Sequence, residues 1–271
     1  MARPTVQAES CIVSASMRKR AAFTIVQNES VFLPLWLQYY ERYFDRIDLY
    51  VLDHNSDDGS TAAVGARCNL LRVHREKSFD HEWLNGTVTA FQAFLLRSYE
   101  RVLFAESDEI VVADPALYAG LDDYIERCHN QVARCTGFEV VHYPDEEPAL
   151  HFDRPILAQR QYWHASRMYC KPLLSAVPMS WSLGFHEAPG FPDLRPDPNL
   201  VLVHLHRIDF DSCVAHHRAT AARNWSEHDA QAGYGLQNRL VEGDDAFKTW
   251  FFRGLDNSGR ERIPEHLKTL L

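Results

Sequence analysis

The sequence predicts an α/β fold in which a mainly parallel sheet is flanked by helices and followed by a helical C-terminal region. Three observations support this class. Short apolar, β-branched runs alternate with segments whose apolar residues recur at helical spacing. Polar and acidic residues gather directly after several predicted strands. The chain has 271 residues, of which 46% are hydrophobic and 24% charged, which is enough for one sizeable core.

The first predicted strand, residues 23–27, ends in Asn28 and Glu29. A helix is predicted over residues 31–44 because apolar and aromatic side chains recur there at helical spacing, with Ser30 as its N-cap. A strand followed by a helix begins the kind of unit that joins parallel strands.

The second and third predicted strands are residues 47–52 and 70–73, joined by the loop DHNSDDGS and a short helix. Asp, Asn, Ser and Gly favour turns and caps, so this loop needs no function. Alternatively, Asp53 ends its strand at the edge where parallel sheets bind ligands. There it could accept a hydrogen bond from a base or from a ribose hydroxyl.

A helix over residues 85–99 leads into a strand at 102–105, which ends in Glu106-Ser107-Asp108-Glu109. Carboxylates packed this closely repel one another unless a cation neutralises them. Mg²⁺ and Mn²⁺ take carboxylate oxygens and commonly bridge to phosphates. The pattern indicates a divalent metal site, and the alternative is a solvated turn.

The second half is less regular, and no linker divides it from the first. The leader over residues 1–20 is expected to be mobile, and residues 21–271 to form one domain. The further predicted elements are a helix at 115–129, strands at 137–142, 156–162 and 200–205, and a mostly helical remainder.

The charge balance excludes several classes of protein. The chain carries 28 Lys and Arg against 37 Asp and Glu, a formal net charge of −9. This argues against a nucleic-acid partner, because affinity for nucleic acid comes largely from Lys and Arg. No stretch approaches the roughly 20 apolar residues that span a bilayer, so we expect no transmembrane segment and a cytoplasmic protein. Neither G-x-x-x-x-G-K-S/T nor G-x-G-x-x-G occurs, so no glycine loop cradles phosphates.

The segment FTIVQNESVFLPLWLQYYERYFDRIDLYVLDHNSDDGST resembles the opening of a family 2 glycosyltransferase of the GT-A (Rossmann-like) fold. It is most similar to the branch with an N-E-x-x-x-L-x-x-W-x-x-Y-Y segment before the second strand. ESDEI falls where that family carries its D-x-D motif, often written D-x-D-E-F. The resemblance covers residues 23–112 well and continues more loosely through KPLLSAVPMSWSLGFHEAPG and LVHLHRIDF.

The resemblance implies a division of labour along the chain. The nucleotide-binding half is residues 21–115, the acceptor half 116–224 and the helical tail 225–271.

The resemblance also assigns roles to single residues. Asn28 and Glu29 lie near the nucleotide, Asp53 contacts the base, and Asp57 belongs to the acidic turn that follows. Glu106 and Asp108 stand at the two ends of the D-x-D and contact the ribose and a divalent metal between them. Glu106 departs from the family, which has Asp there. Glu187, in GFHEAPG, is our choice for the base that deprotonates the acceptor hydroxyl.

His204, His206 and Trp83 complete the predicted site. Two residues apart on a strand, the histidines face opposite sides of the sheet, so both bind one ion only if the strand has ended. A histidine is a third metal ligand in some GT-A enzymes, and the alternative is a structural role for each. Trp83 is predicted in a loop that touches the substrate.

Taken together, the resemblance implies a metal-dependent inverting glycosyltransferase with Mn²⁺ or Mg²⁺ as cofactor. It would move a sugar from a nucleotide-sugar, expected to be UDP-linked, to a hydroxyl of a glycan, a lipid-linked molecule or a small molecule. Two alternatives stay open. One is a non-catalytic nucleotide- or sugar-binding protein on a degenerate transferase scaffold. The other is a nucleotidyltransferase, which usually needs a basic, glycine-rich phosphate loop that this chain lacks.

Overall fold

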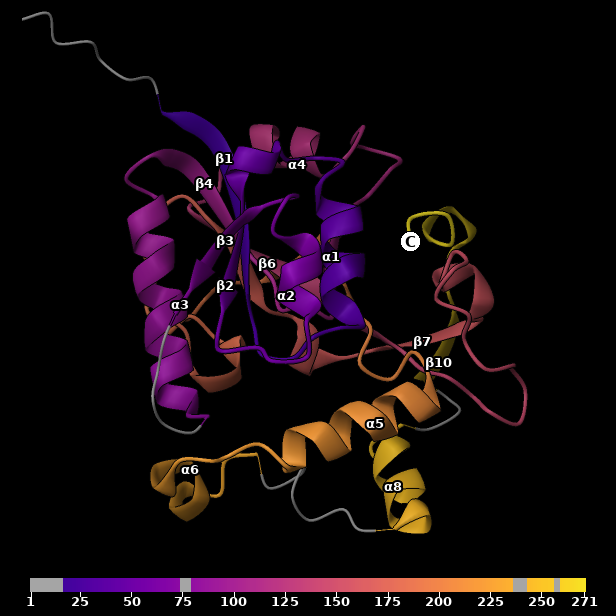
Figure 1. The fold of residues 1–271 in the computed structure, drawn as a ribbon. Coiled ribbons are helices and arrows are strands. Elements are labelled where there is room, and N and C mark those ends of the chain that lie inside the picture. Colours follow the sequence, from indigo (N-terminus) through magenta and orange to yellow (C-terminus); the bar gives the residue numbers. More distant parts are fainter. Residues whose placement is uncertain (1–16, 74–78, 236–242, 256–258) are drawn as a thin grey trace, which may run out of the picture.

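A ten-stranded sheet runs through the described part of the chain (Figure 1). The computed structural model describes residues 17–73, 79–235, 243–255 and 259–271. Most of the predicted leader lies outside these residues. The strand order is β10-β7-β6-β8-β4-β1-β2-β3, with β5 paired to β9 and β9 to β6. Helices flank the sheet, and the predicted α/β class is confirmed.

The first four strands form the parallel part of the sheet. β1 pairs in parallel with both β2 and β4, and β2 pairs in parallel with β3. Val26 lies opposite Asp53, and Phe23 opposite Phe104, so the strands reach one edge together. The bounds are Arg18–Val26 for β1, Leu49–Asp53 for β2, Asn69–Arg72 for β3 and Tyr99–Phe104 for β4.

The remaining strands make the other half of the sheet mixed. β6 pairs in parallel with β9, whereas β4 with β8, β5 with β9, β6 with β7, β6 with β8 and β7 with β10 are antiparallel. The bounds are Glu109–Ala113 for β5, Val132–Val140 for β6, Tyr162–Ala165 for β7, Pro172–Ser175 for β8, Pro196–His204 for β9 and Arg260–Arg262 for β10.

The helices lie on both faces of the parallel strands and below their carboxyl ends. In Figure 1, α3 covers one side and α1 and α2 the other, while α5, α6 and α8 lie beneath the strand ends. None of the described helices has both the length and the apolar character needed to cross a bilayer. The bounds are Phe32–Tyr40 for α1, Ser60–Val64 for α2, His81–Leu95 for α3, Leu121–Arg127 for α4, Phe210–Ala221 for α5, Glu227–Ala232 for α6 and Asp244–Phe251 for α8.

Helix α1 is fixed to the sheet by its aromatic face. Trp36 and Tyr40 are fully buried, with ring centroids 4.6 Å apart. The Tyr39 hydroxyl donates to the Val111 carbonyl oxygen at 2.9 Å, so α1 is tied to β5. The predicted cap is wrong: Val31, not Ser30, precedes the helix, and no side chain caps it.

The predicted strand over residues 156–162 is also wrong. Leu157–Gln159 form a 3₁₀ turn, and β7 begins only at Tyr162. The next residue after the turn, Arg160, is fully buried. Its guanidinium donates to the carbonyl oxygens of Pro148 and Ile208, so the side chain ties the residue after the turn to the segment that precedes α5.

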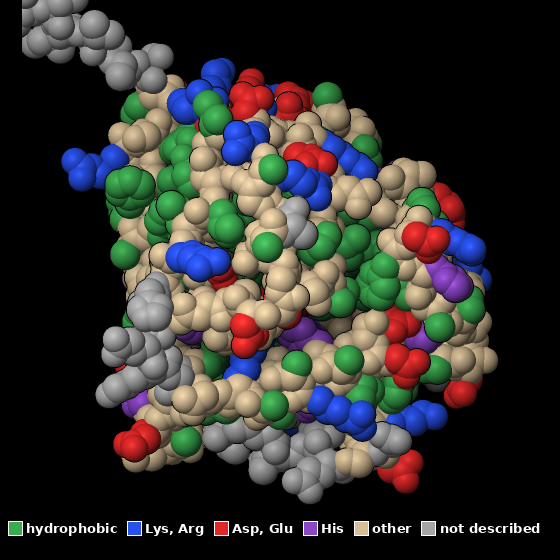
Figure 2. Space-filling model, in the orientation of Figure 1, with side chains coloured by type: hydrophobic (Ala, Val, Ile, Leu, Met, Phe, Trp, Pro, Cys, Tyr) green, Lys and Arg blue, Asp and Glu red, His purple; other side chains and the backbone are tan. Residues whose placement is uncertain are grey.

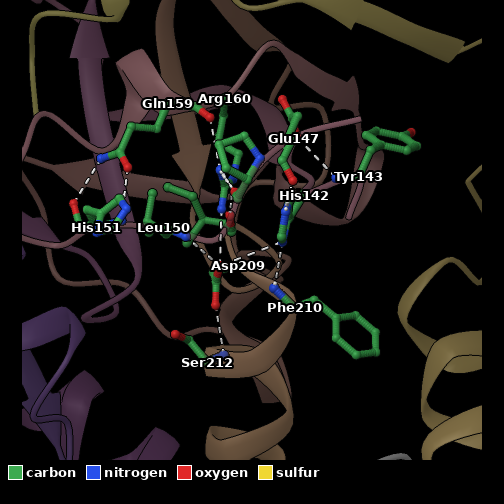
Figure 3. A network of polar contacts seen from close by, with 12 residues as sticks. His142, Tyr143, Glu147, Leu150, His151, Gln159, Arg160, Asp209, Phe210 and Ser212 are labelled. Atoms are coloured by element: carbon green, nitrogen blue, oxygen red, sulfur yellow. Dashed lines mark hydrogen bonds and ion pairs between the residues drawn. The ribbon is translucent and has the colours of Figure 1, made fainter. Parts of the chain in front are cut away.

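A network centred on Asp209 anchors the start of α5 (Figure 3). Asp209 is the N-cap, and its Oδ1 accepts from the Ser212 backbone N–H at 2.9 Å. Its Oδ2 accepts from the Leu150 backbone N–H at 3.0 Å and from Arg160 Nη2 at 3.1 Å. His142 Nδ1 lies 3.6 Å from the same oxygen. These contacts hold α5 beneath the strand ends.

Candidate active site

A pocket opens at the edge where β1 and β4 end. It is lined by the turn between β4 and β5, by residues that follow β1 and β9, and by α5 and the segment after it. Figure 2 shows histidine side chains in the hollow above α5, with acidic and basic groups beside them. The charged or titratable residues that line the pocket are Glu29, His54, His81, Glu106, Asp108, His206, His216 and Arg223.

Asp108 is held in the turn between β4 and β5, where two histidines converge on it. His204 Nε2 and His206 Nδ1 each lie 3.4 Å from Asp108 Oδ2. Both reach the same oxygen because β9 ends at His204, so the alternation of side chains along a strand no longer holds at His206. The strand has therefore ended where it must for both histidines to reach one ion.

Glu139 fixes the orientation of His204. His204 Nδ1 lies 3.0 Å from Glu139 Oε1, and the ring stacks on Tyr169 with centroids 3.8 Å apart. Burial would raise the pKa of Glu139, but the hydrogen bond from His204 brings it below its ordinary value. Since an ionised carboxylate only accepts, Nδ1 carries the hydrogen, and Nε2 is directed at Asp108.

His206 and His216, which both line the pocket, differ in charge. Burial opposes protonation of His206, but Cys213 and the Asp108 carboxylate raise its pKa well above the ordinary value. Burial also acts against ionisation of Asp108, yet His204 and His206 hold its pKa well below the usual range. Burial and the charge of His206 lower the pKa of His216 to about 3. At neutral pH the pocket therefore holds a His206–Asp108 ion pair beside a neutral His216.

The donor set of Asp108, His204 and His206 suits a divalent transition metal. A spacing of 3.4 Å between nitrogen and oxygen is about that of two atoms each ~2.1 Å from one ion at a tetrahedral angle. As their side chains lie, the described residues include no group of three or more His, Cys, Asp or Glu arranged to hold a metal ion. The chemistry of these three side chains fits a divalent metal ion, while in this structure Asp108 and the histidines form an ion pair with one another.

Glu106 does not join this cluster. Its Oε2 lies 2.5 Å from Lys171 Nζ, which is also 2.6 Å from Glu109 Oε1. Burial disfavours a charged Lys171, but the two carboxylates outweigh it and raise the pKa of Lys171. A buried lysine thus supplies part of the positive charge that neutralises the carboxylates of residues 106–109. The predicted pairing of Glu106 with Asp108 on one metal ion does not match this arrangement, because Lys171 holds the Glu106 carboxylate.

The residues predicted to surround the nucleotide separate into two groups. Asn28 Nδ2 donates to Asp57 Oδ1 at 2.9 Å, and the Asp57 backbone N–H donates to Asn28 Oδ1 at 2.9 Å, on the rim of an adjoining hollow that also reaches Arg223. Asp53 is buried and accepts from the Ser56 backbone N–H at 2.8 Å. Its carboxylate shapes the loop, as the turn interpretation expects, and is absent from the described lining of the pocket.

Glu29 does line the pocket. Its Oε1 lies 3.4 Å from Arg223 Nη2, and its Oε2 lies 3.7 Å from His216 Nδ1. Burial raises the pKa of Glu29 to about 8, although Arg223 acts in the opposite direction. Near neutral pH this carboxyl group is mostly protonated and does not repel an anion.

Trp83 and Glu187 lie elsewhere than expected. Trp83 is in the first turn of α3, not in a loop, and its ring lies 4.5 Å from that of His54. Glu187 accepts from both terminal nitrogens of Arg134 at 2.7 Å, and its side chain is 59% exposed. The hydrogen bond from Arg134 lowers the pKa of Glu187, which makes it a weaker base.

Sequence reasoning missed Lys171 and Glu139. Lys171 precedes the apolar run PLL, and a lysine at the start of a buried strand signals an internal ion pair. Glu139 falls within a predicted strand at a position that turns out to be buried. Neither residue reveals its partner through spacing, because the partners lie 65 positions away.

Comparison with known proteins adds a distant structural likeness. No protein-family model and no curated protein matches this chain. Among solved structures it is similar to the mannosyltransferase PcManGT from Pyrobaculum calidifontis, in complex with GDP-Man and Mn²⁺. The TM-score is 0.40 with 15% sequence identity, over 88% of this chain and 70% of that one. At this distance the likeness does not show what the chain binds or does.

Proposed function

We propose that this chain is a glycosyltransferase that transfers a sugar from a nucleotide-sugar to an acceptor hydroxyl. The observation that carries the proposal is the convergence of His204 and His206 on Asp108, which with His206 lines a pocket where the parallel strands β1 and β4 end. Ligands of such sheets bind beyond the carboxyl ends of the strands. The D-x-D-like turn and the resemblance of residues 23–112 to family 2 glycosyltransferases support the same activity.

We further propose that the enzyme is inverting and metal-dependent, with a UDP-sugar as the expected donor. Asp108, His204 and His206 would hold Mn²⁺ or Mg²⁺. The ion would supply Lewis-acid stabilisation of the negative charge on the departing diphosphate. Glu139 supports this role because a metal-binding histidine usually donates its other N–H to a carboxylate or carbonyl group.

Glu187 stays our assignment for the general base. To take the proton of an acceptor hydroxyl, its carboxylate must lie within hydrogen-bond reach of that group. Arg134 holds both carboxylate oxygens, so productive binding of an acceptor requires one of these bonds to be shared or exchanged.

Asp108→Asn tests the function and the metal together. The amide keeps the shape of the side chain but removes the charge, so we expect transfer to fall by about 100-fold or more. Nucleotide release from UDP- and GDP-sugars would be measured with Mn²⁺ over a broad acceptor panel. Asp145→Asn, at an exposed position, is the matched control.

The possible outcomes separate the alternatives. Full transfer by Asp108→Asn in Mn²⁺ would show that the metal role is wrong. Nucleotide binding by the wild type without turnover on any acceptor favours the non-catalytic binding protein. Release of pyrophosphate from a nucleoside triphosphate favours a nucleotidyltransferase.

A further inference from the structure

Arg223 lies directly after the last turn of α5 and faces the pocket. Its Nη2 donates to the Gln27 carbonyl oxygen at 2.8 Å and lies 3.4 Å from Glu29 Oε1. Only 16% of the side chain is exposed. Among the described residues, its hydrogen bonds all use Nη2, so Nε and Nη1 keep their N–H groups for a ligand.

The backbone around Arg223 is held firmly against the pocket wall. The Phe79 N–H donates to the Asn224 carbonyl oxygen at 2.7 Å, and the Ser226 N–H donates to the Phe79 carbonyl oxygen at 2.9 Å. The Arg223 guanidinium also lies over the Phe79 ring, 5.3 Å from its centroid. A ring against one face of the guanidinium leaves the N–H groups in its plane as the available donors.

The charges around the pocket leave Arg223 without full compensation. Lys171 is engaged by Glu106 and Glu109, and His206 by Asp108. Arg223 is the one Arg or Lys among the described residues that line this pocket. Its carboxyl neighbour Glu29 has a pKa of about 8, so at neutral pH that neighbour is mostly uncharged.

We propose that Arg223 binds a phosphate group of the nucleoside diphosphate through the N–H groups of Nη1, while Nη2 stays on Gln27 and Glu29. This proposal rests on the function proposed for the pocket. A guanidinium N–H that donates to a phosphate oxygen makes a charge-assisted hydrogen bond, which is stronger than a neutral one. The alternative is a purely structural role, in which Arg223 only ties the end of β1 to the segment after α5.

Arg223→Ala and Arg223→Lys are compared with Arg218→Ala, which removes an exposed arginine from α5. Calorimetry with Mn²⁺ measures the binding of UDP, GDP, inorganic pyrophosphate, uridine and guanosine. Loss of a charge-assisted hydrogen bond weakens binding by about 10- to 100-fold. We expect Arg223→Ala to lose this much affinity for the nucleoside diphosphate and for pyrophosphate, with less than about 2-fold change for the nucleoside. The affinity of Arg223→Lys should fall between that of Arg223→Ala and that of the wild type, because lysine keeps the charge but not the planar guanidinium. Arg218→Ala should match the wild type.

The nucleoside arm distinguishes a phosphate contact from a structural role. Equal losses for nucleoside and diphosphate overturn the proposal, as does unchanged diphosphate affinity in a variant whose circular dichroism is native. If Arg223→Ala does not fold, Arg223→Lys carries the comparison. Pyrophosphate binding that depends on Arg223 in a protein that transfers no sugar supports the anion site and contradicts the proposed function. A wild type that binds neither pyrophosphate nor a nucleoside diphosphate contradicts both.

Discussion

Glu29 shows how burial sets ionisation at the scale of single residues. Its side chain is 11% exposed, beside Arg223 and His216. The carboxylate gains too little from Arg223 to offset its loss of water, so its pKa rises to about 8. The same burial has the opposite result at Asp108, because two imidazoles contact that carboxylate.

The raised pKa predicts how stability depends on pH. Between the ordinary value of 4.5 and about 8, the folded protein keeps a proton on Glu29 that the unfolded chain releases. The contribution of protonated Glu29 to the free energy of unfolding is complete below pH 4.5 and is lost as pH rises toward 8. The free energy of unfolding therefore falls by at most about 1.4 kcal/mol per pH unit from this group. Glu29→Gln should flatten this decline in urea unfolding at pH 5, 6, 7 and 8, without nucleotide or divalent ion. Glu100→Gln, at an exposed position, should keep the wild-type slope. Equal slopes in all three proteins would contradict the pKa assignment.

At the scale of elements, the parallel strands were predictable because each is a short apolar run next to a helical pattern. β5 and β8 were not predicted. EIVVA follows the acidic turn so closely that it reads as its continuation, and PLLS has only four residues. What makes them strands is their pairing with β9, β4 and β6, which lie far away in the sequence.

The candidate site divides in the same way. Asp108, His204 and His206 were predictable from residue type and position, and the end of β9 at His204 explains how both histidines reach one oxygen. The choice of Lys171 as partner for Glu106 was not predictable, because the antiparallel pairing of β8 with β4 brings them together. Short-range patterns give the residue types of a site, while long-range pairing decides which side chains meet.

Asp209 gives a prediction for one element, α5. Asp209→Ala removes the N-cap, worth about 1 kcal/mol, and leaves the buried Arg160 without the carboxylate that it hydrogen-bonds. Loss of one partner of a buried ion pair costs about 3–5 kcal/mol. We therefore expect a loss of about 3–5 kcal/mol in the free energy of unfolding, measured in urea. Asp211→Ala, in the exposed first turn of the same helix, should cost less than about 1 kcal/mol. Similar losses for both variants would mean that Arg160 finds another partner.

At the scale of the whole molecule, one sheet and one main core join the two halves named in the sequence analysis. β4 of the nucleotide-binding half pairs with β8 of the acceptor half, with Val102 opposite Ser175. The main hydrophobic cluster extends from Ala21 to Leu271. The two halves thus describe where ligands are expected to bind, while the packing between them is continuous.

This continuity predicts that the two halves unfold together. Buried tryptophans report on each half. Trp36 lies on α1, which Tyr39 ties to β5, and Trp163 stacks on Phe138 of β6 with ring centroids 4.1 Å apart. The signal of each tryptophan is the part of the wild-type fluorescence change that is lost in Trp36→Phe or in Trp163→Phe. We expect both signals and the circular dichroism to give one common unfolding midpoint in urea. Chains of this length often unfold through intermediates, so coincident transitions are a demanding result. Two separated midpoints would show that the β4–β8 pairing is too weak to couple the halves, and that the chain has two folding units instead of the one domain expected from the sequence.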